Sequence, residues 1–164
     1  MASRLIHQRR LSDDTWRVAQ TPAGLPADAD ALVSLADWLA HRDAWRARGG
    51  RLGVALEPAD DPLALSDDLD CLALVTVNFP AFTDGRGYST ARLLRERVGY
   101  AGQLRAVGDV FKDQLFYLSR VGFDAFLLRE GETADDALAA LDTFSEAYQA
   151  SVERPEPLFR RRLG

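Results

Sequence analysis

The hydrophobic residues of this chain form short continuous runs, separated by stretches in which apolar positions recur at helical spacing. Such runs predict strands at residues 51–58, 71–79, 103–107 and 124–128. The run at residues 71–79 is continuous, which is typical of a strand that is buried on both faces of a sheet. The helical spacing predicts helices at residues 86–98 and 110–121, which end at Gly99 and Gly122.

Two further helices are marked by cap pairs in their first turns. Ser34 and Asp37 follow a short strand at residues 32–34 and predict a helix at residues 35–48, which Gly49-Gly50 ends. Its shared apolar face is formed by Leu35, Trp38, Leu39 and Trp45. The second pair is Thr133 and Asp136, and that helix carries on one side Leu138, Leu141, Phe144 and Tyr148.

The N-terminal segment has a different pattern. Two short alternating segments, residues 5–8 and 16–19, flank the polar stretch "RRLSDD" and predict a β-hairpin in which they pair. The following "TPAGLPADAD" is rich in turn-forming residues and predicts a connecting loop.

Strands that alternate with helices predict right-handed crossovers and a parallel sheet. We therefore expect an α/β fold, a parallel sheet of four to five βα units that is half-barrel-like or open, with an N-terminal β-hairpin. The chain of 164 residues is expected to form a single domain, 1–164, with the hairpin and its loop in 1–30 and a surface tail in 151–164. Ligands of such sheets bind at the carboxyl ends of the strands.

Composition narrows the function classes. Hydrophobic residues make up 47% of the chain, which excludes a disordered protein, and the net charge of −5 argues against nucleic-acid binding. The first residues lack the apolar core of a signal peptide, and no apolar run reaches membrane-spanning length. We expect a cytoplasmic protein without a membrane partner.

The cysteine and histidine content bears on cofactors. Cys71 is the only cysteine, which excludes an internal disulfide, a redox pair and an all-cysteine metal site. Its position beside an apolar run predicts a small core residue. His7 and His41 have no metal-ligand spacing, and no dinucleotide fingerprint or phosphate-binding loop is present. The sequence therefore predicts no metal and no cofactor.

The loop after the strand at 71–79 contains the stretch "TDGRGYS", which precedes a helix. Free N–H groups at a helix start, together with glycines that allow close approach, can hold an anion. The candidate anion-binding residues in this loop are Asp84, Gly85, Arg86, Gly87, Tyr88 and Ser89. In the alternative interpretation Asp84 caps the helix and the glycines only permit the turn.

Arg105 lies inside a predicted buried strand, where an unpaired guanidinium would be costly. One interpretation is a structural ion pair with a carboxylate near a strand end, the candidates being Glu57, Asp84, Asp109 and Glu130. The other is that Arg105 binds an anionic ligand such as a carboxylate, a phosphate or a sulfur oxyanion.

Two more groups of charges are notable. Asp109 and Lys112 follow the strand at 103–107 and are candidates for anion binding or acid/base chemistry. In the alternative interpretation Asp109 caps the next helix and Lys112 is solvated in its first turn. Six carboxylates between Glu57 and Asp70 lack the spacing of a calcium loop and predict a solvated acidic edge that could serve for docking.

The block "FPAFTDGRGYSTARLLRERVGYAGQLRAVGDVFKDQLFYLSRVGFDAF", residues 79–126, resembles a bacterial family classed as a domain of unknown function. The resemblance is looser from "LADWLAHRDAWRARGGRLGVALEP" onward. Genes of this family often lie beside sulfite reductase in sulfate-assimilation operons, and members are sometimes labelled oxidoreductases of sulfite reduction. No catalytic residues are carried over from the family.

Two hypotheses of function follow. The first, implied by the resemblance, is an accessory protein of assimilatory sulfite reduction that acts on or with sulfite reductase or its electron donor. The second is a small α/β enzyme or sensor that binds an anionic metabolite at the carboxyl-end rim of the sheet. Because a half-barrel leaves an apolar face or sheet edges uncovered, we also expect a homodimer.

Overall fold

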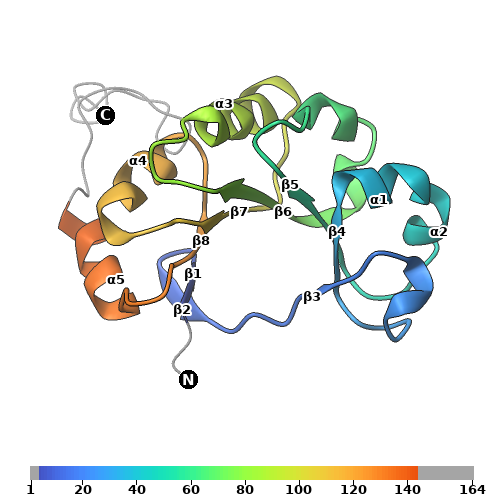
Figure 1. Ribbon diagram of the computed structural model, residues 1–164, viewed down its shortest axis with the longest axis horizontal. Helices are drawn as coiled ribbons and strands as arrows, with labels where there is room; N and C mark the ends of the chain where they lie inside the picture. The colour runs from blue at the N-terminus through green and yellow to red at the C-terminus, as the bar shows by residue number, and fades with distance from the viewer. Residues whose placement is uncertain (1–3, 144–164) are drawn as a thin grey trace, which may run out of the picture.

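The computed structural model describes residues 4–143, which form one eight-stranded, mostly parallel sheet that curls into a half-barrel (Figure 1). The strands, in chain order, are β1 (Leu5–His7), β2 (Arg10–Ser12), β3 (Arg17–Val18), β4 (Ala31–Ser34), β5 (Leu52–Leu56), β6 (Leu72–Phe79), β7 (Gln103–Gly108) and β8 (Ala125–Leu127). Their order across the sheet is β2-β1-β8-β7-β6-β5-β4-β3. Strands β3 to β8 are mutually parallel, and β1 is antiparallel to both β2 and β8.

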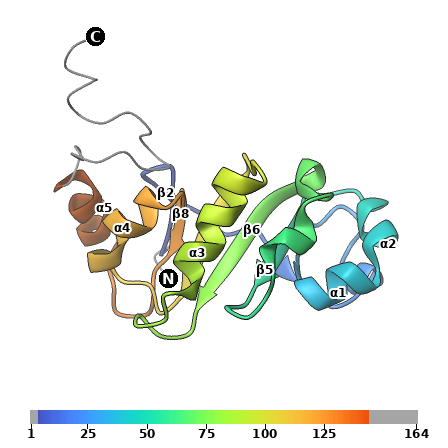
Figure 2. The same ribbon diagram turned by 90° about the horizontal axis from the view of Figure 1, so that it is seen from above.

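The helices cover the convex side of this sheet, as the two ribbon views show (Figures 1 and 2). They are α1 (Leu35–Ala40), α2 (Arg42–Arg46), α3 (Arg86–Arg92), α4 (Leu115–Arg120) and α5 (Ala134–Thr143). Short 3₁₀ turns lie at Pro22–Gly24, Pro62–Leu65, Leu69–Cys71 and Lys112–Gln114, and a π-helical turn extends α3 over Leu93–Arg97. The expected α/β half-barrel is confirmed, but helices cover one face of the strands rather than both.

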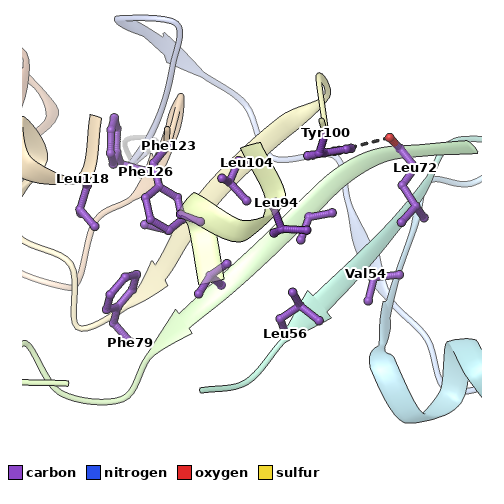
Figure 3. Packing of buried hydrophobic residues seen from close by; sticks show 14 of the residues in the cluster. Val54, Leu56, Leu72, Phe79, Leu94, Tyr100, Leu104, Leu118, Phe123 and Phe126 are labelled. Carbon is purple, nitrogen blue, oxygen red and sulfur yellow. Dashed lines mark hydrogen bonds between the residues drawn. The ribbon is translucent and has the colours of Figure 1, made fainter. Parts of the chain in front are cut away.

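The hydrophobic core lies between the convex face and the helices. Alternate residues of the central strands, among them Val54, Phe79 and Leu104, are at most 1% exposed and pack against Leu94 and Leu118 from the helical layer (Figure 3). The residues between them in sequence point to the concave face, because successive side chains of a strand alternate. The apolar runs therefore identified the strands correctly.

The predicted hairpin is wrong in its second strand. β1 pairs with β2, with Leu5 opposite Ser12, whereas Arg17 and Val18 lie at the other edge of the sheet, parallel to β4. The hairpin turn is made by Gln8 and Arg9, whose φ angles are 51° and 63°. Two-residue turns with positive φ favour asparagine and glycine, so this turn carries no sequence signal.

Residues 13–16, called the strap below, therefore connect the two opposite edges of the sheet. Eight strands laid flat would place the edges about 34 Å apart, at about 4.8 Å per strand pair. The five residue steps from Ser12 to Arg17 reach at most about 18 Å. The sheet must curl for the strap to reach, and Figure 1 shows the strap crossing its open side.

Several helix boundaries differ from the expectation. The cap at Ser34 is confirmed, since its side chain accepts a hydrogen bond from the Asp37 backbone, but the helix is interrupted at His41 and divides into α1 and α2. The helix predicted from residue 110 begins with a 3₁₀ turn at Lys112. The predicted positions Phe144 and Tyr148 lie outside the described residues. No helix within residues 4–143 has the length and hydropathy needed to cross a membrane.

Tyr100 lies between the helices and the sheet and links the starts of two neighbouring strands, β6 and β7. Its ring is 3% exposed, and its hydroxyl lies 3.2 Å from the carbonyl oxygens of both Leu72 and Gln103, at the starts of β6 and β7. Figure 3 shows this contact to Leu72. Burial raises the pKa of Tyr100, because the charged phenolate is disfavoured there.

Replacing Tyr100 with Phe should lower the free energy of unfolding by about 1–2 kcal/mol at pH 7, because it leaves buried carbonyls short of a donor. Since the pKa of this acid is raised in the folded protein, its protonated form stabilises the fold below about pH 10, and this contribution is lost as the pH rises further. Urea unfolding from pH 7 to 11 measures both effects. A variant that loses stability above pH 10 as steeply as the wild type would contradict the assignment.

Candidate functional site at the carboxyl-end rim

Asp109 connects three consecutive loops at the carboxyl ends of the strands. It follows Gly108, whose φ of 94° turns the chain back at the end of β7. One carboxylate oxygen of Asp109 accepts the Phe82 backbone N–H at 2.9 Å, and the other lies 3.1 Å from Arg129 Nη1. Asp109 therefore joins the loops after β6, β7 and β8, rather than capping the next helix.

An aromatic cluster lies beside this carboxylate. The guanidinium of Arg129 stacks over the ring of Phe111 at 4.5 Å from its centre, and Phe82 meets the same ring edge-to-face at 5.7 Å. Phe82 is 56% exposed although its backbone is held in place. We call Phe82, Asp109, Phe111 and Arg129 the rim cluster. An exposed aromatic ring on a fixed loop beside an arginine is a typical composition of protein-binding surfaces.

The 84–89 segment, which runs from the loop after β6 into the first turn of α3, forms its own contacts. Arg86 donates two side-chain hydrogen bonds to Asp84, at 3.1 and 2.7 Å, and these bonds hold the pKa of Asp84 below its usual value. Gly85 is the N-cap of α3. Tyr88 packs its ring against Phe79, and Ser89 is exposed.

Gly87 is buried for a packing reason. A Cβ at this position would lie 2.5 Å from the Phe79 ring, whereas a Cβ on Gly85 would meet nothing within 4 Å. Gly87 therefore lets α3 lie close to β6, which is an alternative to anion binding that sequence reasoning did not weigh.

Arg105 lies on the concave face and is 3% exposed. Its guanidinium lies 3.2 Å from Asp14 Oδ1 on the strap, and it donates two hydrogen bonds, at 3.1 and 2.8 Å, to Gln103 Oε1. None of the four carboxylates expected as its partner contacts it. Those candidates lie at the far ends of the strands, whereas the strap crosses the sheet over the middle of β7.

The strap is held by a second set of contacts near β5. Trp16 covers Gly53, where a Cβ would lie 3.1 Å from its ring. The guanidinium of Arg51 lies over the Trp16 ring at 5.0 Å from its centre and pairs with Asp30 at 2.7 Å. Two arginines therefore fix the strap, Arg105 near its start and Arg51 at its end.

The sequence-predicted candidates thus fall into separate groups. Asp84 and Arg86 pair with each other, Asp109 belongs to the rim cluster, Arg105 binds the strap, and Lys112 is exposed. Within residues 4–143 no contact joins Arg105 to the 84–89 segment. Binding of an anion by these residues stays a prediction, and such an anion would displace a carboxylate already in place.

The acidic stretch 57–70 is not uniformly solvated. Asp68 is 1% exposed, accepts a hydrogen bond from Trp38 Nε1 at 3.0 Å, and pairs with Arg42 and Arg46 at 3.0 and 3.1 Å. This buried carboxylate ties α1 and α2 to the loop before β6, and so the expected solvated edge is wrong at this position.

Cys71 is half-buried beside this pair, not in the core. Its sulfur lies 3.2 Å from Arg46 Nη1 and 3.1 Å from the Asp68 carbonyl. Burial raises the pKa of the thiol more than the guanidinium lowers it. Within the described chain, no three histidine, cysteine or acidic side chains gather in a group that could hold a metal ion.

The chain is thus a small α/β half-barrel protein that carries the aromatic and charged rim cluster at the carboxyl ends of its strands. The chain belongs to the family described as a bacterial protein of unknown function (DUF934), whose model matches residues 53–159. This match confirms the family resemblance at the level of a bacterial domain of unknown function. No curated protein matches the chain.

Sequence reasoning missed Asp14, Phe82, Phe111 and Arg129. Asp14 lies 91 positions from Arg105 and has no distinctive sequence context. The aromatic residues did have a signal, because Phe82 and Phe111 each follow the carboxyl end of a predicted strand, where apolar side chains are not needed for the core.

Gly87→Ala should destabilise the protein by about 1–3 kcal/mol, because the added methyl group overpacks the contact with Phe79. Gly85→Ala is the matched control and should change stability by less than about 1 kcal/mol. Chemical denaturation of both variants measures the difference. Equal effects of the two substitutions would show that close packing is not the role of Gly87.

The strap ion pair predicts an asymmetry between its partners. Asp14→Ala leaves a buried guanidinium without its carboxylate and should cost about 2–3 kcal/mol. Arg105→Met should cost about 1 kcal/mol or less, because Asp14, whose side chain is 38% exposed, becomes solvated and Met keeps the packing volume. Asp13→Ala, an exposed strap position, controls for changes in the strap itself.

Urea denaturation gives the ranking of these three variants. If Arg105→Met is the most destabilising of the three, the cost of breaking the pair does not come from leaving the buried guanidinium without a carboxylate. Titration of sulfate into the same proteins tests the anion prediction, since Arg105→Met should then bind it more weakly than the wild type does.

Proposed function

We propose that this protein is an accessory factor of assimilatory sulfite reduction, which docks through the rim cluster onto sulfite reductase or its electron donor. The resemblance to a family encoded beside sulfite reductase supports the pathway. The rim cluster supports the mode of action, and the exposed ring of Phe82 on a loop anchored by Asp109 is the observation that carries it.

The geometry favours docking for an energetic reason. Phe82 needs no rearrangement to meet a partner, because its backbone is already bound and its ring is already in contact with Phe111. Preorganised aromatic and arginine side chains contribute most of the energy of many protein interfaces. The two arginines around the rim, Arg86 and Arg129, are already paired with carboxylates, which favours a docking surface over a site for a small anion.

Phe82→Ser should weaken binding to the partner by at least about tenfold, as expected for loss of a central aromatic contact. Tyr117→Ser, which removes another exposed ring from the outer side of α4, is the matched control and should bind as the wild type does. Co-purification with sulfite reductase from the organism that encodes the chain, followed by titration, measures both variants.

Wild-type protein that binds neither the reductase nor its electron donor would exclude this proposal. Light scattering of the same samples tests the expected homodimer, which stays a prediction. The strap covers the concave face that suggested a dimer, and the exposed apolar residues Leu11 and Val18 on the edge strands are now the reason to expect one.

A further inference from the structure

A cavity of about 460 Å³ lies at the end of the sheet opposite the rim cluster. It is bounded by the β1–β2 turn, the end of α3's π-helical extension, α4, the start of β8 and α5. The residues that line it include Arg9, Arg95, Ser119, Phe123, Asp124 and Phe126. Pockets of this size that combine an apolar wall with a few polar groups are the usual form of small-molecule sites.

One end of the cavity holds a pair of opposite charges. The Arg95 side chain is 13% exposed and donates hydrogen bonds to the carbonyls of Gly122, Tyr100 and Gly102. Its Nη2 lies 3.5 Å from Asp124 Oδ1, which also accepts the Leu104 backbone N–H at 2.8 Å. These bonds hold both charged groups in fixed positions, and the two formal charges offset each other. The other lining cation, Arg9, is paired with Asp142 at 3.7 Å.

The remaining wall is mostly apolar. Phe123, Phe126 and Leu141 are at most 3% exposed and belong to the hydrophobic core, while Ser119, 6% exposed, adds a hydroxyl from α4. A planar apolar group fits against such a wall, and the serine hydroxyl can serve as donor or acceptor.

The turn that borders the cavity is conformationally costly. Gln8 and Arg9 both have positive φ without being glycine, which costs on the order of 1 kcal/mol or more at each residue. Such backbone conformations persist where the surrounding structure enforces them, and they concentrate at ligand sites. Here both strained residues line the cavity.

We propose that this cavity binds a small uncharged molecule with a planar apolar body and a group that both donates and accepts hydrogen bonds, as a primary carboxamide does. The amide N–H₂ faces Asp124, and its oxygen faces Arg95 and Ser119. An anion would meet the Asp124 carboxylate and a cation the Arg95 guanidinium, so neither charged analogue is favoured.

Three probes of nearly equal shape separate these cases: benzamide, benzoate and benzylamine. Titration into the full-length, ¹⁵N-labelled protein should give millimolar binding of benzamide, with amide shifts at Gly122, Phe123 and Asp124. Benzoate and benzylamine should bind at least fivefold more weakly. Equal or tighter binding of either charged probe, shifts confined to the rim cluster, or no binding of benzamide would overturn the proposal.

Variants test the location. Ser119→Leu fills the cavity and should weaken benzamide binding at least tenfold, and the milder Ser119→Ala, which keeps the packing, should weaken it about threefold. Tyr117→Leu, on the exposed side of the same helix, is the control and should bind as the wild type does. Unchanged affinity in Ser119→Ala, together with unchanged affinity in any Ser119→Leu protein that folds, would place the probe elsewhere.

Discussion

The strap is the constraint on which the rest of this structure depends. Four residues join the first edge strands of the sheet to the last, so the eight strands can pair as they do only if the sheet is strongly curved. Curvature separates a convex face, which the helices cover, from a concave face too narrow for a helix layer. Asp14 and Trp16 complete that concave face, and the buried guanidinium of Arg105 fixes where the strap crosses it.

At the rim, one carboxylate has a comparable organising role. Asp109 binds a backbone N–H of the preceding loop and an arginine of the following loop, so the three loops are held as a unit. The same sheet therefore presents two different ends. The rim cluster carries an exposed aromatic ring, whereas the opposite end contains a cavity that is open to solvent and holds a charge pair. The proposed docking surface and the proposed small-molecule site therefore lie at opposite ends of the sheet.

The fold class could be predicted because burial in a parallel sheet produces apolar runs, and such runs mark β5 to β8, although Arg105 interrupts the run in β7. The segment at residues 16–19 was predicted to be extended, but its place beside β4 was not, because Arg17 and Val18 are both exposed and their partner is set by curvature, not by local pattern. The position of Arg105 in a buried strand showed that it needs a carboxylate partner. That this partner is Asp14 could not be predicted, because the strap brings together parts of the chain that are distant in sequence. Asp109 was recognised as a candidate, yet its role as a link between loops depends on Arg129 and Phe82, whose positions follow only from the assembled rim.

The pairing of β1 with β8 has a consequence for how the chain reaches this structure. The N-terminal hairpin joins the sheet only beside β8, with Leu5 opposite Leu127, so it has no lasting partner until most of the chain has been synthesised. Contacts between such distant positions carry a large loop-closure entropy and slow the folding of a domain. Strands β4 to β7, with their helices, can associate first through neighbouring segments, and closure by the hairpin and strap then follows. The ribosome-bound chain would therefore expose the concave face, including the cationic side chain of Arg105, until the last strand emerges.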